Sequence, residues 1–199
     1  MFERTSFLTI CLSIVMAFRD SGLMISAKDA RRFLFEVKYI SVRSNPMKGK
    51  VAEFVMNCLL IFIFSYLLNF LWESFHAVAL YAKHNFQSQR YVPMVSYVAT
   101  VDGFLILGIY LFVAALWRNL FWLKNMKKQQ MFASIFTGMA VSGVIEYVRV
   151  FVSKAWAYNQ FMPTIFGIGI SPLFQLSTTG LSAFLLTRAI LYQKGVFSN

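Results

Sequence analysis

Nineteen consecutive residues, from Phe54 to Trp72, carry no charge, and most of their side chains are apolar. A helix needs about 20 such residues to cross the hydrocarbon core of a membrane. The whole chain has the same character, because 58% of its 199 residues are hydrophobic and only 14% are charged. In a soluble domain about 25% of the residues are charged. The sequence therefore predicts an integral membrane protein, and its length fits one compact bundle.

Four segments of the chain are long and apolar enough to be predicted as membrane-spanning helices. They cover approximately residues 52–80, 92–117, 130–151 and 171–190. The fourth starts late because Pro163 and Pro172 interrupt the apolar run before it. We therefore predict an all-α integral membrane protein in which residues 51–199 form a four-transmembrane-helix bundle.

Residues 1–50 are predicted to form a basic segment at the membrane interface. The apolar run 7–18 is only twelve residues long, which favours an amphipathic or half-inserted helix, with a fifth span over 5–26 as the alternative. Seven Lys and Arg residues mix with aromatic and aliphatic ones in 27–50, as is typical of a segment on an anionic membrane surface. Because the positive charges are spread over loops between the spans, we expect no nucleic-acid partner.

The distribution of Lys and Arg predicts the orientation. The segment before the first span and the loop 118–130 are rich in these residues, whereas the loops 81–93 and 149–170 hold two each. The N-terminus, the loop 118–130 and the C-terminus are therefore expected in the cytoplasm, with the other two loops outside. Glu53, at the cytoplasmic start of the first span, is expected to be a charge-paired helix end.

Three of the few acidic residues after residue 50 are predicted to lie inside the membrane. Glu73, Asp102 and Glu146 belong to three different spans and fall in the outer half of the bilayer. A carboxylate at such depth is costly unless it is paired, protonated or solvated, so each is a functional candidate. The structural alternatives are a protonated Asp102 that joins two helices, an interfacial position for Glu73 beside Trp72, and an ion pair of Glu146 with Arg149.

Polar residues also fall on one face of three predicted helices. Spacings of three and four residues, which define a helix face, occur in Ser65, Asn69, Glu73 and His76, in Ser134, Gly138, Ser142 and Glu146, and in Ser171, Gln175, Thr178 and Ser182. A stripe of small residues such as the second is the surface that packs on a neighbouring helix. Because these faces avoid lipid only by facing each other, we expect a polar, acidic cavity in the outer half of the bundle.

The predicted outer loop 153–175 is long, aromatic and uncharged after Lys154, and four Pro and Gly residues break it. Irregular backbone at membrane depth must be covered by protein or border a water-filled cavity. We therefore expect a re-entrant or interfacial cap over the cavity, with an aromatic belt on lipid headgroups as the alternative. The predicted ligand-binding residues are the polar side chains of this loop and of the facing helices, Asn69, Trp156, Tyr158, Asn159 and Gln175.

Acid–base chemistry on a lipid or isoprenoid-type substrate is the first function that these residues favour. Carboxyl groups of different burial can divide the acid and base roles between them. Asp102, the deepest, is the predicted acid, and Glu73 or Glu146 is the base, with His76 as a proton relay. The sequence has no nucleophile elbow, histidine-rich box, glycine-rich phosphate loop or redox cysteine pair. Isomerisation or cyclisation is therefore expected rather than hydrolysis, desaturation, phosphoryl transfer or thiol chemistry.

Two other uses of the cavity stay open. The spacing Glu73-x-x-His76 occurs in metal-binding helical bundles, so Glu73, His76, Asp102 and Glu146 form an alternative set of metal ligands, although the sequence specifies no cofactor. The other interpretation is that the chain is a small transporter, a proton or cation pathway, or a non-enzymatic membrane assembly subunit. A chain this short would transport as an oligomer. The expected partners are membrane lipid and a hydrophobic or cationic small molecule.

Several short stretches resemble a family of small polytopic membrane proteins of bacteria. They are LNFLWESFHAVALY, ATVDGF, IEYVRVF, WAYNQFMP and GIGISPLFQ, and together they cover about residues 60–176. The resemblance implies a multi-pass protein of the bacterial inner membrane and no particular activity. The architecture is also similar to that of the emopamil-binding-type sterol isomerases, small helical membrane proteins with carboxylates around an intramembrane lipid pocket. None of their motifs aligns with this chain, so this second similarity concerns architecture alone.

Overall fold

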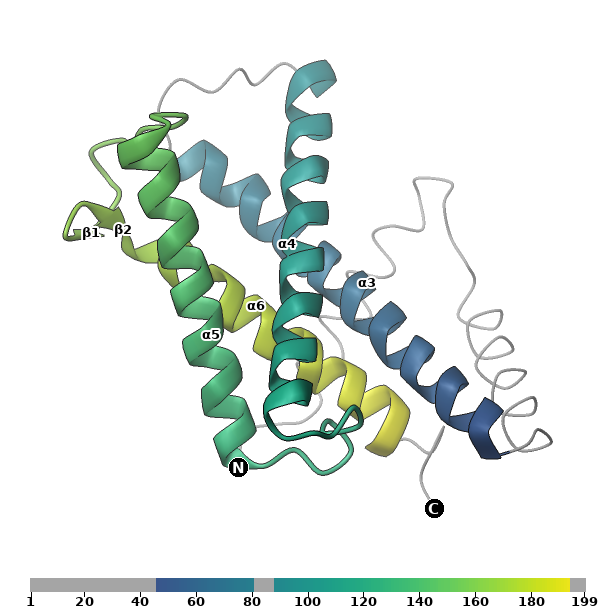
Figure 1. Cartoon of the computed structure of the whole chain (residues 1–199). Helices are drawn as coiled ribbons and strands as arrows, with labels where there is room; N and C mark the ends of the chain where they lie inside the picture. Colours follow the sequence, from purple (N-terminus) through teal and green to yellow (C-terminus); the bar gives the residue numbers. More distant parts are fainter. Residues whose placement is uncertain (1–45, 81–87, 194–199) are drawn as a thin grey trace, which may run out of the picture.

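The computed structural model describes residues 46–80 and 88–193, which are mostly helical (Figure 1). The four long helices are α3 (Pro46–Leu80), α4 (Ser88–Leu116), α5 (Lys128–Tyr147) and α6 (Ile170–Arg188). A π-helical turn extends each of the last two helices, η2 (Val148–Val152) after α5 and η3 (Ala189–Gln193) after α6. The short strands β1 (Thr164–Ile165) and β2 (Ile168–Gly169) pair in an antiparallel hairpin before α6.

Three of the described helices are long and apolar enough to cross a membrane, as the sequence predicted. They are Gly49–Leu80, Gln89–Leu116 and Lys128–Val152. The fourth, α6, has 19 residues and covers the predicted segment 171–190 almost completely, but its crossing of the membrane stays a prediction. The chain is thus a mostly helical, multi-pass membrane protein. The predicted interfacial segment 1–50, with the alternative span over 5–26, lies outside the described residues except for 46–50.

The first two helices begin before the predicted membrane spans. Helix α3 starts at Pro46, because proline at a first helical position needs no N–H partner and its ring already fixes a helical φ. The predicted membrane span starts at residue 52, so the helix extends before it through Lys48 and Lys50. Helix α4 starts at Ser88, five residues before Pro93. At that position proline removes a single backbone hydrogen bond near the helix start, so the helix continues through it.

Successive helices run in opposite directions, so the end of α3, the start of α4, the end of η2 and the start of α6 lie at one end of the bundle (Figure 1). We call this the cap end, because the segment 153–169 also lies there. Helix α3 packs mainly on α4 and α6, and α5 packs mainly on α6.

The face of α5 predicted from its small residues is confirmed as its packing face. Its buried residues are Gln130, Ser134, Gly138, Ser142 and Glu146, which are each four apart. The backbones of α5 and α6 approach closely at Gly138, where an added Cβ atom would lie 2.9 Å from both the Cα and the N atom of Ser177. A side chain at this position would therefore push the two helices apart.

The far end of the bundle is held by aromatic packing and by a small hydrogen-bond cluster. Tyr110, Trp122 and Phe184 are fully buried there, with ring centroids 5.4–6.2 Å apart. Nearby, the Tyr192 hydroxyl donates to the Glu53 carboxylate over 3.0 Å and accepts from Asn57 Nδ2 over 2.7 Å. Glu53, predicted as a charge-paired helix end, is thus tied to η3 by a hydrogen bond.

Candidate acidic site

The side-chain amide of Gln175 lies at the centre of the predicted acidic region. Its Nε2 atom is 2.6 Å from Glu73 Oε1, 3.0 Å from Asp102 Oδ2 and 3.2 Å from Asn69 Oδ1. Helix α6 supplies the amide, α3 supplies Asn69 and Glu73, and α4 supplies Asp102. Three helices thus bring four of the predicted site residues into direct contact, and we call this group the acidic cluster.

The geometry of α3 explains why the Asn69 side chain faces Gln175. Asn69 and Glu73 are four residues apart and therefore project from the same face of the helix. The Asn69 Nδ2 group donates to the Ser65 carbonyl over 2.9 Å, which turns its Oδ1 atom toward α6. The Thr179 hydroxyl also lies 3.2 Å from Asn69 Oδ1, and it is 2.8 Å from the carbonyl of Gln175. The contacts around Gln175 therefore link α3 and α6 over a full helical turn.

Acceptors outnumber donors in the acidic cluster. An amide nitrogen carries two hydrogens, yet three oxygen atoms surround that of Gln175, and two of them belong to carboxyl groups. Within the described residues, neither Glu73 nor Asp102 forms an ion pair with Lys or Arg. Asp102 is buried and Glu73 is half-buried. Buried acceptor oxygens without a donor cost free energy. Protonation of a carboxyl group, or binding of a molecule that donates hydrogen bonds, would lower this cost.

Glu146 lies close by and is contacted by the predicted cap. The Tyr158 hydroxyl donates to Glu146 Oε2, and Trp156 Nε1 lies 3.4 Å from the same oxygen. The Tyr158 oxygen in turn accepts the backbone N–H of Gly169 over 3.0 Å. Arg149, the predicted ion-pair partner of Glu146, places its guanidinium group 5.5 Å from the centre of the Trp156 ring. The segment 153–169 therefore packs over a buried carboxyl group.

The three carboxyl groups share one electrostatic environment. The Glu73 carboxylate repels that of Asp102, and the Glu146 carboxylate repels that of Glu73. These groups come from three different helices, α3, α4 and α5, as predicted. Proximity of like charges makes ionisation of all three together unfavourable.

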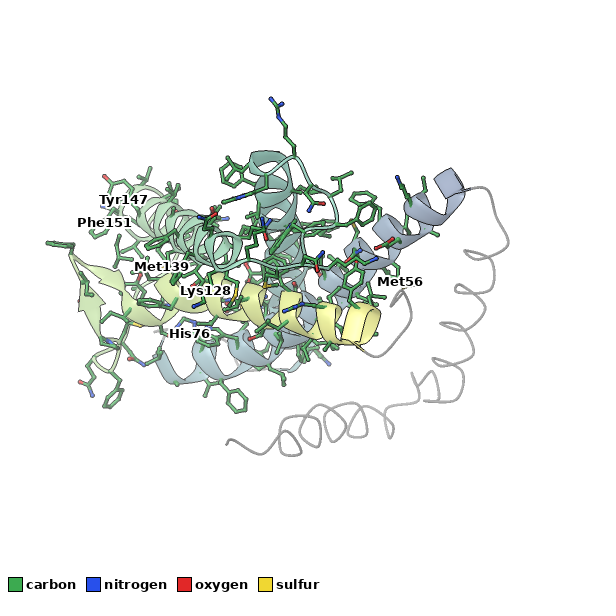
Figure 2. The ribbon with its side chains drawn as sticks, turned by 90° about the horizontal axis from the view of Figure 1, so that it is seen from below. Met56, His76, Lys128, Met139, Tyr147 and Phe151 are labelled. Atoms are coloured by element: carbon green, nitrogen blue, oxygen red, sulfur yellow. The ribbon has the colours of Figure 1, made fainter. Side chains whose placement is uncertain are left out.

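Two further predicted site residues, His76 and Asn159, lie near the C-terminal end of α3. His76 is buried and meets the Trp72 ring edge-on, with centroids 6.3 Å apart. In Figure 2 it lies toward the cap end of α3, opposite Met56 at the other end. Asn159 caps α3, because its Nδ2 group donates to the Ala79 carbonyl over 2.7 Å and its backbone N–H donates to that of Leu80 over 3.0 Å. Its predicted ligand-binding amide is therefore engaged by the helix end.

The alternative metal site finds no support in this geometry. Across residues 46–80 and 88–193, no three His, Cys, Asp or Glu side chains converge closely enough to hold a metal ion. Glu73, His76, Asp102 and Glu146 therefore do not form the predicted ligand set here. The acidic cluster instead uses an amide nitrogen as its common partner.

One residue of the predicted polar face of α6 is wrong. Thr178 was predicted to share the face of Gln175, but it is exposed, and its hydroxyl contacts carbonyls of its own helix. The buried partner is Thr179, four residues after Gln175. Two adjacent threonines have the same residue type, so composition cannot distinguish them. The strict spacing of four along this helix would have identified Thr179.

Removal of the Tyr158 hydroxyl is expected to loosen the cap. Tyr158→Phe deletes the donor to Glu146 and the acceptor for Gly169, which should lower the free energy of unfolding by about 1–3 kcal/mol. Trp156→Phe deletes the longer contact to Glu146 and keeps an aromatic ring beside Arg149, so it should cost less. Thermal unfolding of both variants in the same detergent measures the difference. A stability loss no greater for Tyr158→Phe than for Trp156→Phe would contradict the assigned contacts.

The stability difference between wild type and Tyr158→Phe is also expected to depend on pH. Burial and the hydrogen bond to Glu146 raise the pKa of the Tyr158 phenol above its ordinary value of 10.0. Folding therefore favours the neutral phenol, whose contribution is complete below pH 10 and is lost as the pH rises toward the folded-state pKa. The stability difference between wild type and Tyr158→Phe should shrink above pH 10. A difference that is constant through this range would show that the phenol does not titrate in this environment.

The fold and the acidic cluster together define a class, the polytopic helical membrane proteins with carboxyl groups buried between their spans. Comparison of the chain with protein-family models, curated proteins and solved structures finds no match.

Proposed function

We propose that the protein binds a small amphipathic molecule, of the lipid or isoprenoid type, whose headgroup donates hydrogen bonds to the acidic cluster. The observation that carries the proposal is the set of three acceptor oxygens around the single amide of Gln175. A ligand hydroxyl or protonated amine would supply the missing donor, and an amine would also offset the charge of Glu73 and Asp102.

Unpartnered buried groups near the acidic residues support a ligand at this place. Within the described residues, Ser65 Oγ, Ser142 Oγ and Trp72 Nε1 are buried and have no hydrogen-bond partner. Ser65 lies one turn before Asn69 on α3, Trp72 is the sequence neighbour of Glu73, and Ser142 lies one turn before Glu146 on α5. Buried polar atoms are normally satisfied, so these three suggest room for a further polar partner. The predicted cavity would open when the ligand displaces the Gln175 amide.

Acid–base chemistry on this ligand is the proposed activity. Asp102, buried and within hydrogen-bond reach of Gln175, is the proposed acid, and the less buried Glu73 is the proposed base. Glu146, held by Tyr158, would be the alternative base, and His76 the proton relay. Such groups suit an isomerase-like or cyclase-like proton transfer. The ligand would arrive from the outer leaflet of a bacterial inner membrane, with both termini in the cytoplasm, as the Lys and Arg distribution favours.

A proton or cation pathway is the second candidate. Three carboxyl groups from three helices repel one another within one region, and they extend from the buried Asp102 toward the cap at Glu146. Such a series of acids is typical of proton relays in membranes. In reconstituted vesicles a proton pathway predicts a pH-driven flux that Asp102→Asn abolishes, whereas the binding function predicts no flux.

Three probes with the same alkyl chain test the proposed function. Dodecylammonium, dodecanol and dodecanoate are added to the purified protein in a mild detergent, and thermal unfolding is followed. A ligand at 100 times its dissociation constant stabilises the folded state by about 2.7 kcal/mol. The amine and the alcohol are expected to raise the unfolding temperature, because they donate hydrogen bonds. The carboxylate is expected to lack the effect, because it only accepts them.

Two variants make the test specific. Asp102→Asn should lose the advantage of the amine over the carboxylate, because the attracting charge is gone. Glu53→Gln removes an acid at the far end of the bundle and should leave that advantage unchanged. Equal stabilisation by all three probes, or an unchanged advantage of the amine in Asp102→Asn, would refute a donor-selective acidic site.

A further inference from the structure

The tip of the β1–β2 hairpin has an unusual residue at an unusual backbone conformation. Phe166 and Gly167 form the turn with φ values of +52° and +76°. Two consecutive positive φ values are those of a type I′ turn, where Asn and Gly are preferred. A bulky aromatic residue with positive φ is uncommon, and 96% of the surface of Phe166 is exposed. Neither the turn nor the core of the protein gives a reason for an aromatic ring here.

The hairpin folds back against the last turn of the third membrane-spanning helix. A Cβ atom added at Gly167 would lie 2.8 Å from the ring of Phe151. Phe151 belongs to η2 and lies one residue before the end of the span Lys128–Val152. The tip is thus level with the end of a helix that is long and apolar enough to cross the membrane. Figure 1 shows the hairpin beside this helix rather than above its end.

Large apolar side chains are frequent on the exposed surface of the hairpin and of the end of the span, where the exposed charged residues are Arg149 and Lys154. The exposed large hydrophobic residues from 144 to 166 are Val144, Tyr147, Val148, Phe151, Val152, Phe161, Ile165 and Phe166. No charged residue occurs between Lys154 and Arg188. The outward face of a membrane span meets lipid, and Phe166 extends that face beyond the helix.

We infer that the β1–β2 hairpin is a membrane anchor, which inserts Phe166 and Ile165 into the lipid at the interface of the leaflet at the cap end. Pairing of Thr164 with Gly169 and of Ile165 with Ile168 satisfies part of the hairpin backbone. The backbone groups along the two open edges need water or headgroups as partners, which restricts the hairpin to the interface. A single turn permits shallow insertion, at the level of Phe151. Lys154, which is exposed and precedes the hairpin, lies at headgroup level in this arrangement.

The anchor is connected to the acidic site by a short path. Gly169, at the end of β2, donates its N–H to the Tyr158 hydroxyl, which donates to Glu146. The backbone N–H of Ile170, which starts α6, donates to the Pro163 carbonyl before the hairpin. Lipid contact at Phe166 therefore holds the cap over Glu146 and fixes the start of the helix that carries Gln175. The anchor itself does not depend on the proposed ligand.

Nitroxide labels on the full chain test the anchor. Phe166→Cys, Gln160→Cys and Val144→Cys are made in a background of Cys11→Ser and Cys58→Ala, labelled, and reconstituted in vesicles of phosphatidylethanolamine and phosphatidylglycerol. Collision rates with oxygen, which concentrates in lipid, and with a water-soluble nickel chelate are then compared. Val144 is the lipid reference on the span. Gln160 is the water reference, because it is exposed in the same loop next to the residue that caps α3.

The anchor predicts an oxygen-to-nickel ratio at residue 166 several-fold above that at 160 and close to that at 144. A ratio equal to that at 160 would place the tip in water and overturn the inference. Low collision rates with both reagents would also overturn it, since they indicate contact with a second protein copy. If the protein labelled at residue 166 fails to fold, the variants Phe166→Trp and Gln160→Trp test the same point in vesicles of brominated lipid, which quenches the fluorescence of tryptophan in contact with it. Quenching must then increase over wild type only for Phe166→Trp.

Discussion

Replacement of Gln175 with leucine is expected to lower the free energy of unfolding by about 3 kcal/mol, the upper end for buried hydrogen-bonding groups left without a partner, because the variant keeps the buried acids and removes their common donor. Leucine has nearly the volume of glutamine, so the change affects hydrogen bonding more than packing. In the variant, Glu73, Asp102 and Asn69 lose the Gln175 Nε2 contacts of 2.6–3.2 Å. Unfolding by heat or denaturing detergent, with helix content as the signal, measures the loss.

Two comparisons make this prediction specific. Thr178→Val removes a polar group from the exposed face of the same helix and should change stability by less than about 0.5 kcal/mol. The triple variant Gln175→Leu, Glu73→Gln, Asp102→Asn should regain part of the loss, since neutral amides can donate to each other. Independent, additive effects of the three substitutions would contradict a shared network.

Substitution of Gly138 with alanine is expected to cost about 1–3 kcal/mol, the usual cost of overpacking a tight contact. The added methyl group would lie 2.9 Å from backbone atoms of Ser177, and backbone cannot move aside as a flexible side chain can. Either α5 moves away from α6 or both helices shift along their axes. Because α5 and α6 carry Glu146 and Gln175, the response of the dodecylammonium probe should weaken in the same variant.

Gly108→Ala is the matched control for Gly138→Ala. Gly108 also lies in a long helix, but an added Cβ atom would meet nothing within 4 Å. Alanine is the better helix former by up to about 1 kcal/mol, so Gly108→Ala should be neutral or stabilising. Equal destabilisation by the two substitutions would show that glycine acts through the flexibility of the chain rather than through close packing of α5 on α6.

Residue spacing predicted which helix faces form the acidic cluster, but not the contacts within it. The four-residue repeats through Asn69 and Glu73 and through Gly138 and Glu146 predicted which faces turn inward, because lipid excludes polar faces regardless of the rest of the fold. The same argument predicted that Gln175 and Asp102 would face the other helices. Their meeting at one nitrogen atom depends on helix rotation and sliding, which spacing along one helix does not determine.

Other features required the tertiary structure. Asn159 and Tyr158 lie two residues apart in a loop of similar composition, yet one caps α3 and the other contacts Glu146. Irregular loops have no period, so residue type alone cannot assign such roles. The position of Phe166 in a two-residue turn was also unpredictable, because its sequence lacks the Asn-Gly or Asp-Gly signal of such hairpins.

The most direct test of the central claim is mass spectrometry of the small molecules, lipids and metals that co-purify with the protein in mild detergent. Wild type is compared with Asp102→Asn and Glu146→Gln, each prepared from the same amount of membrane. The proposed function predicts one amphipathic species, bearing a hydroxyl or amine headgroup, that is bound to wild type and depleted in Asp102→Asn. The same bulk lipids in all three preparations, with no species that depends on the carboxyl groups, would contradict it.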